Sequence, residues 1–227
     1  MSGGLLFLLL LIPAIVLHEL SHGYVAHLLG DDTAKNAGRL TLNPLKHIDR
    51  VGTILVPLGL AIAQIATIGH VQFLYGWAKP VPVNPMNLQI NGTRNPRRLM
   101  AIVAVAGPAM NFALALLAGV ALHGGVGIDY LIFFIEINLL IGIFNLIPLP
   151  PMDGGRIAVG VLPLPLAIRL AKSERLGIFL VLFVLFILPM VMQQFGIRFD
   201  PFQDAMGFIL PYAQNIVLTL TGNHIGN

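Results

Sequence analysis

The sequence predicts an all-α polytopic membrane protein with five or six transmembrane helices, a re-entrant or hairpin segment and a small β element at the membrane face. Composition is the first reason: hydrophobic residues are 56% and charged residues only 10% of 227 positions, and the mean hydropathy is +0.85. Soluble domains rarely combine such values. Long apolar runs are the second, because about 20 apolar helical residues cross about 30 Å of hydrocarbon. The third is the lack of any repeat, low-complexity tract or linker, so we expect one membrane domain over residues 1–227.

Four apolar runs are the clearest candidates for membrane-spanning helices. They are, in chain order, Gly3–Leu29, Leu99–His123, Tyr130–Leu149 and Leu176–Met192. A fifth run, Val51–Gly76, contains a proline and a glutamine and leads into GWAKPVPVNP (76–85), whose prolines cannot continue a helix. The last run, Phe202–Thr221, is interrupted by Pro211, and we expect either a sixth span or an interfacial helix there.

The distribution of positive charge predicts the orientation of these helices. If Asp31–Arg50 is cytoplasmic and Leu99–Asp153 leaves and returns on that side, 12 of the 13 Lys and Arg residues face the cytoplasm, and only Arg198 lies outside. That asymmetry is the one that the positive-inside rule predicts. This orientation requires Val51–Pro96 to enter and leave the membrane on the same, cytoplasmic side. Irregular backbone at membrane depth survives only where it is packed in protein or lines a wet cavity.

The most informative motif is HELSH, residues 18–22, directly behind thirteen apolar residues. His18 and His22 are four residues apart on a helix, so both imidazoles can reach one ion, and Glu19 can contact a water beside it. The chain has no cysteine, so a metal site must use His, Asp or Glu. The alternative is that these polar residues only pack inside a bundle. Such a motif would arise by chance roughly once in 300 chains of this composition.

A catalytic zinc usually has three protein ligands and one open position, so a third ligand is needed. Glu136 and Asp153 are the candidates at membrane depth. We favour Asp153, because prolines interrupt the helix before it and Gly154–Gly155 allow a close backbone approach. The alternatives are that Asp153 caps a helix and that Glu136 forms an intrahelical hydrogen bond. The histidines lie about 11 to 17 Å from the helix end at Leu29, so the site should be sunk below the cytoplasmic surface.

These motifs together resemble the site-2 protease family of intramembrane zinc metalloproteases, in a short form without PDZ or CBS domains. The similar segments are HELSH (18–22), GRLTLNPLKHID (38–49), GWAKPVPVNP (76–85), AGPAMN (106–111) and NLIPLPPMDGG (145–155). They cover nearly the whole chain. One departure is Arg50, which stands where the family has a second proline after HID. We do not expect this loop change to affect the chemistry.

The resemblance implies a role for each matching residue. It implies that His18, His22 and Asp153 bind one Zn2+ per chain and that Glu19 is the general base. It further implies that Asn111 and Asn145 face the site and steady a substrate carbonyl. The protein would then be an integral multi-pass protein of a prokaryotic inner membrane, with its active site toward the cytoplasm.

The expected reaction is hydrolysis of a peptide bond within or near the transmembrane segment of a single-span membrane protein. GRLTLN (38–43) could be an edge strand that pairs with the unwound substrate, or a plain surface hairpin. His47 could donate to a ligand or to substrate, or be an interfacial turn residue. The lipid bilayer is the expected surrounding, and the basic loops face lipid headgroups rather than nucleic acid. No regulatory partner is indicated.

Two other classes of protein share parts of this pattern. An inactive family member would bind membrane segments without cutting them, and its usual mark is a missing glutamate or ligand. A zinc transporter can also carry a similar histidine motif in a membrane helix. It would need polar ligands on a second helix, for which the remaining long spans offer only Glu136.

Overall fold

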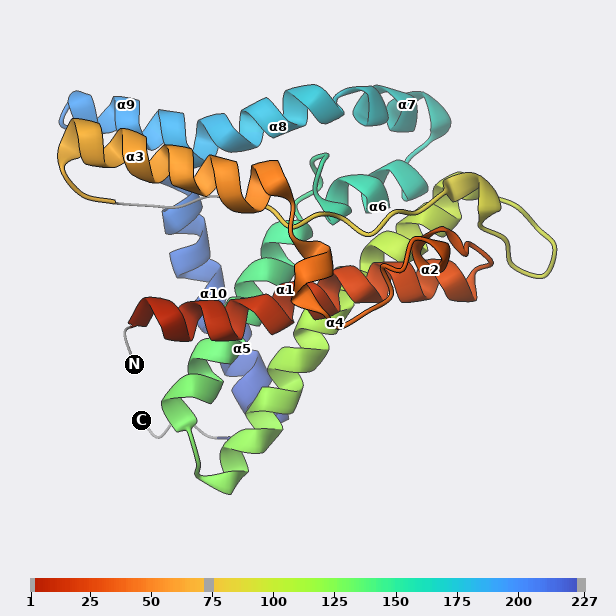
Figure 1. Ribbon diagram of the computed structural model, residues 1–227, viewed down its shortest axis with the longest axis horizontal. Coiled ribbons are helices and arrows are strands. Elements are labelled where there is room, and N and C mark those ends of the chain that lie inside the picture. The colour runs from red at the N-terminus through yellow and green to blue at the C-terminus, as the bar shows by residue number, and fades with distance from the viewer. Residues whose placement is uncertain (1–2, 72–75, 224–227) are drawn as a thin grey trace.

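The computed structural model describes residues 3–71 and 76–223, and secondary structure in this part of the chain is helical (Figure 1). The α-helices are α1 (Gly3–Leu28), α2 (Thr33–Asn36), α3 (Val56–Ile68), α4 (Pro96–Ala121), α5 (Ile128–Asn145), α6 (Asp153–Val161), α7 (Leu164–Lys172), α8 (Glu174–Leu182), α9 (Leu188–Gln194) and α10 (Pro201–Leu220). Two π-helical segments, Arg50–Leu55 and Phe183–Ile187, lead into α3 and join α8 to α9. Short 3₁₀ turns are Pro44–His47, Pro85–Asn87 and Leu122–Gly124.

Local sequence explains where the long helices begin. Helix α4 begins at Pro96, and the Asn95 side chain before it accepts a hydrogen bond from the backbone N–H of Arg98. Helix α10 begins in the same way, with Pro201 preceded by an aspartate that accepts from Gln203 N. Proline suits the first helical position because that N–H has no partner within the helix, and the cap satisfies another free N–H.

Helix α4 is the centre of the packing and contacts α1, α5, α6 and α10 (Figure 1). One apolar core joins α4 to α5 and α10, and it contains Ala115, Ala118, Ile135, Leu139, Val217 and Leu218. A second core joins α4 to α1 and to the loop that precedes α4, through Ala26, Leu88, Leu99 and Val103. Alanine is frequent on α4, and such small side chains allow close approach of apolar helices. Both helices that carry the candidate metal ligands, α1 and α6, therefore pack on α4.

Within the described residues, three helices are long and apolar enough to cross a membrane: Leu6–Leu28, Pro96–Gly124 and Ile128–Asn145. Arg50–Ala66 and Phe179–Gln194 are apolar but shorter. The expectation of five or six spans is therefore not confirmed. Three of the four clearest runs are found as candidate spans, whereas the apolar helix of the Leu176–Met192 run, Phe179–Gln194, is shorter. The apolar helix of the Val51 run ends at Ala66, and α10 carries Asp204 and several amides along its length.

The chain between α1 and α4 returns to the place from which it leaves. Trp77 N donates to Gly52 O over 3.1 Å, and Thr53 Oγ1 donates to Trp77 O over 2.8 Å. The chain at residues 52–53 and the chain at Trp77 therefore lie side by side. The segment between them leaves this place and returns to it, as in a hairpin. The position of this hairpin relative to a membrane stays a prediction. Residues 72–75, directly before GWAKPVPVNP, lie outside the described part.

The small β element expected at GRLTLN is not found. Residue 38 lies in a turn and residues 40–42 form a bend, and the described chain contains a single isolated bridge, Ile90 with Thr93. Side chains in this stretch bond to nearby backbone instead: Asn43 N donates to Thr41 Oγ1 over 3.2 Å. Arg39 donates to Lys79 O over 2.7 Å. The Thr41 bond is local and competes with a strand ladder, and the Arg39 bond fixes the stretch to a segment 40 residues away, so the alternating pattern does not lead to a strand here.

Candidate metal centre

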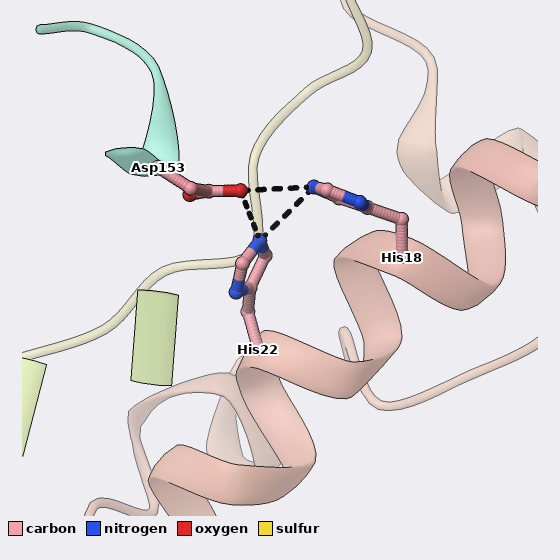
Figure 2. A group of neighbouring side chains, drawn as sticks. All are labelled: His18, His22 and Asp153. Carbon is pink, nitrogen blue, oxygen red and sulfur yellow. Dashed lines mark hydrogen bonds and ion pairs between the residues drawn. The ribbon is translucent and has the colours of Figure 1, made fainter. Parts of the chain in front are cut away.

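Three side chains from two elements converge on one point. His18 and His22 project from the same side of α1, and Asp153 projects toward them from the first turn of α6 (Figure 2). His18 Nε2, His22 Nε2 and Asp153 Oδ2 form a triangle in which each pair of atoms is 3.1 Å apart. All three residues are buried. Among the described residues this is the group of His, Asp and Glu side chains that can hold a metal ion.

The hydrogen-bond partners of the two imidazoles turn their lone pairs toward this point. His22 Nδ1 faces Val103 O over 2.8 Å, and His18 Nδ1 faces Asn111 Oδ1 over 2.6 Å. Both oxygens are acceptors, so both Nδ1 atoms carry the hydrogen and both Nε2 atoms carry the lone pair. The carboxylate adds a third acceptor. Three acceptors at contact distance repel one another unless a cation lies between them.

The geometry fits zinc. Zinc binds histidine nitrogen and carboxylate oxygen at about 2.0 to 2.2 Å, and tetrahedral coordination then places neighbouring ligand atoms about 3.3 Å apart. The observed separations of 3.1 Å are close to that value. Two nitrogens and one oxygen leave one tetrahedral position free, as in catalytic zinc sites. Glu136, the other candidate for the third ligand, lies on α5 and is not part of the group.

Glycines allow the three segments to come this close. A Cβ atom on Gly107 of α4 would lie 2.4 Å from His22 Nε2 and 2.6 Å from His18 Nε2. A Cβ on Gly154 would lie 2.2 Å from Leu146 O. Real Cβ contacts are longer than this, so both positions need glycine. The expectation that glycine lets the backbone approach behind Asp153 is consistent with this geometry, and Gly107 has the same function on the opposite side.

Glu19 is held by a loop that runs along α1. We call residues 77–89 the strap. The strap residue Val81 donates its backbone N–H to Glu19 Oε2 over 3.0 Å. Lys79 N donates to His47 O over 2.8 Å, and Gln89 N donates to Leu29 O over 2.8 Å, so the strap is attached on both sides of this contact. The Glu19 side chain, which is partly exposed, is thus oriented by main chain 62 residues away.

Asp31 attaches the strap to the end of α1 through its carboxylate. The residue is fully buried, and its carboxylate accepts from Asn84 N over 2.7 Å and from Asn87 Nδ2 over 2.9 Å. It also accepts from the backbone N–H and the hydroxyl of Thr33. Burial alone raises the pKa of Asp31, but these hydrogen bonds outweigh it and hold the pKa of the carboxyl below its usual range. Asp31 is therefore ionised at neutral pH, and its carboxylate connects the strap to the end of α1.

Asn111 and His47 form hydrogen bonds within the protein, and their expected contact with substrate stays a prediction. Asn111 is fully buried, and its Nδ2 donates to Asn138 Oδ1 over 2.9 Å while its Oδ1 faces His18. It orients a ligand. His47 is also buried; its Nε2 donates to Thr41 O over 2.9 Å, and its carbonyl accepts from the strap. It supports the loops beside Glu19 and is not in the metal group.

Asn145 is the last residue of α5 and is partly buried. Its Nδ2 donates to Ile141 O over 3.0 Å, one turn earlier on the same helix. A side-chain amide has a second N–H, so this bond leaves one donor for another partner. The expected contact between Asn145 and a substrate carbonyl stays a prediction.

Sequence reasoning missed three groups: the Val81 N–H, the Val103 carbonyl and the Asn138 side chain. The first two are main-chain atoms, which every residue has, so no pattern of side chains could reveal them. Asn138 did carry a signal. It is an amide within the apolar run IFFIEINLLIGIF, and a polar residue at membrane depth is a functional hypothesis by itself.

Comparison with known proteins agrees with this site. Residues 121–188, which include Asp153, match Peptidase family M50. The chain is 38% identical over 193 residues to the Bacillus subtilis protein named "Putative zinc metalloprotease YwhC", and the match covers 79% of each chain. It is 30% identical over 187 residues to "Putative zinc metalloprotease Rip2" of Mycolicibacterium smegmatis, which covers 78% of this chain and 64% of that one. No solved structure showed a significant match. The chain belongs to peptidase family M50, the site-2 protease family of zinc metalloproteases.

Proposed function

We propose that this protein is an intramembrane zinc endopeptidase that cleaves within or beside the transmembrane segment of a single-span membrane protein. The observation that carries the proposal is the triangle of His18 Nε2, His22 Nε2 and Asp153 Oδ2, with 3.1 Å sides. Two of its corners belong to a helix that is long and apolar enough to cross a membrane. A peptidase site on such a helix faces substrates that are themselves in the bilayer.

In this proposal His18, His22 and Asp153 hold one Zn2+, which when bound polarises a peptide carbonyl and activates the attacking water. Glu19 accepts the proton of the attacking water and passes it to the leaving amine nitrogen. The Val81 N–H keeps one carboxylate oxygen of Glu19 occupied, so the other oxygen is available for proton transfer. Asn145 has a free N–H with which to donate to the developing oxyanion.

The proposed location is the inner membrane of a prokaryotic cell, with the site opening to the cytoplasm and the lipid bilayer around the spanning helices. The distribution of Lys and Arg supports this orientation. A helical substrate segment has its carbonyls in helical hydrogen bonds, so it must unwind before it reaches Glu19.

The test is a reconstitution of the wild-type protein and Glu19→Gln in liposomes with a panel of single-span reporter proteins. Products are identified by intact mass, and zinc per chain is measured on the same samples. We expect cleavage by the wild type only, with about one zinc in both proteins, because the amide keeps the size of Glu19 but cannot take a proton.

The same samples separate the two other classes of function. Zinc in both proteins with no cleavage of any reporter would favour a protein that binds membrane segments without cutting them. Movement of zinc into the liposomes, equal for both proteins, would indicate a transporter. Equal cleavage by both proteins would exclude Glu19 as the base.

A further inference from the structure

Two buried amides connect the ligand His18 to helix α5. Asn111 on α4 and Asn138 on α5 are both 0% exposed. An amide in an apolar helix interface is destabilising unless its hydrogen-bonding groups find partners. Asn111 Nδ2 donates to Asn138 Oδ1 over 2.9 Å, and Asn138 Nδ2 donates to Phe134 O over 2.8 Å. The two amides therefore form a continuous line of bonds from α5 through α4 to α1.

Each of the two amides can be oriented in only one way, because a main-chain carbonyl beside it accepts a hydrogen bond. Phe134 O can only accept, so Asn138 must turn its NH2 group toward it and present Oδ1 to α4. Asn111 must then present its own NH2 group to Asn138. The same NH2 group faces a second carbonyl, Ala14 O, over 3.4 Å. Asn111 Oδ1 is left to face His18 Nδ1, over 2.6 Å.

The direction of the bonds decides the tautomer of His18. Because Asn111 Oδ1 is an acceptor, His18 Nδ1 must carry the hydrogen, and Nε2 then carries the lone pair that faces His22 and Asp153. If the Asn111 amide turned over, its NH2 group would face His18 Nδ1 and favour the tautomer with hydrogen on Nε2. That tautomer cannot bind a metal through Nε2.

We propose that Asn138 is a positioning residue for the metal centre: acting through Asn111, it holds His18 in the tautomer and orientation that bind metal. Asn138 itself contacts none of the three ligands. The proposal rests on metal binding by His18, which is part of the proposed function, and it does not depend on proteolysis. It also gives α5 a direct chemical connection to the site, in addition to the apolar packing of α4 on α5.

The experiment measures the zinc dissociation constant of the full chain in detergent by competition with a chromophoric chelator. Asn138→Leu keeps the approximate size of the side chain and removes both amide groups. We expect zinc to bind about 10- to 100-fold more weakly, the usual effect of losing a residue that supports a metal ligand. Asn138→Asp should bind zinc like the wild type, because a neutral carboxyl offers the same acceptor and donor.

Gln64→Leu is the matched control. Gln64 is a buried amide on α3 that donates to the carbonyl one turn earlier, Leu60 O, over 3.1 Å, and α3 carries no member of the metal group. Its zinc affinity should equal that of the wild type. If Asn138→Leu does not give folded protein, Asn138→Ala carries the same expectation, since it only truncates the side chain.

A double-mutant cycle separates positioning from simple helix packing. In Asn111→Asp both side-chain oxygens accept, so His18 Nδ1 meets an acceptor whichever way the group turns. In this background Asn138→Leu should no longer weaken zinc binding. A loss of stability from packing alone would be the same in both backgrounds, and the melting temperature of the zinc-free variants records it separately.

Two results would overturn the proposal: wild-type zinc affinity in Asn138→Leu, or the same weakening in the wild-type and Asn111→Asp backgrounds. These results differ from a failure of the proposed function. That failure would appear as a wild-type protein that binds one zinc and cleaves no reporter, whatever the effect of Asn138.

Discussion

The backbone N–H of Val81 donates a 3.0 Å hydrogen bond to Oε2 of Glu19 and so joins the strap to the residue proposed as the general base. Val81 is buried against α1, where a Cβ atom on Gly23 would lie 2.6 Å from its side chain. The contact therefore combines a charge-assisted bond with close packing. It indicates that the strap orients the carboxylate.

Replacing Val81 with proline should lower the rate of peptide cleavage without removing zinc. Proline has no N–H, and the extended chain around Val81, between Pro80 and Pro82, can accept another proline. A hydrogen bond to a charged group contributes about 1.5–3 kcal/mol, so kcat should fall about 10- to 100-fold. The measurement is single-substrate kinetics with zinc per chain determined in parallel. Val81→Ala keeps the N–H and should retain most of the rate; equal rates for the two variants would show that this bond has no catalytic role.

Removing the charge of Asp31 should change how the stability of the protein depends on pH. The folded pKa of Asp31 lies below the ordinary carboxyl value, so its stabilisation is fully present above pH of about 4 and is lost as the pH falls through the folded pKa. In Asp31→Asn one acceptor becomes a donor that faces other donors. We expect a lower melting temperature at pH 7 and a flatter decline between about pH 5 and the acid limit.

The check is thermal unfolding in detergent across that pH range for the wild type and Asp31→Asn. The exposed Asp129 provides a control, and Asp129→Asn should follow the wild-type curve. A parallel acid decline in wild type and Asp31→Asn would mean that other carboxyl groups control acid stability.

Adding a methyl group to Gly107 should weaken metal binding. Its Cβ would lie 2.4 Å from His22 Nε2, which is shorter than any real contact, and α4 would have to move away from α1. Zinc per chain should fall well below one after dialysis against a weak chelator. Gly59→Ala is the matched control, because a Cβ there meets nothing within 4 Å and zinc should be retained. Full zinc content in Gly107→Ala would contradict the close approach of α4 to the ligands.

Removal of metal should destabilise the protein. The three ligands come together only in the folded chain, so bound zinc stabilises that state, and the melting temperature in a strong chelator should drop and rise again with added zinc. His22→Ala lacks one ligand and should show little response to zinc. A wild-type melting temperature that does not depend on zinc would indicate that the triangle holds no metal.

Several features of this protein follow from the sequence alone. The placement of His18 and His22 on one side of α1 is a consequence of helical periodicity, which depends only on residues within one turn. The long apolar helices follow from the length of the apolar runs. The prolines before Asp153 and the glycines after it likewise indicate, through local geometry, a break in the helix and a close backbone approach at this residue. These are short-range effects, and the sequence contains all the residues that produce them.

The tertiary structure decided the rest, because it depends on contacts between residues far apart in the chain. It selected Asp153 rather than Glu136 as the third member of the metal group. It showed that Asn111 faces His18, and that the GRLTLN stretch bends so that Arg39 bonds to the strap. A residue type states which hydrogen bonds are possible, but the packing of α1, α4, α5 and the strap determines which partner is within reach.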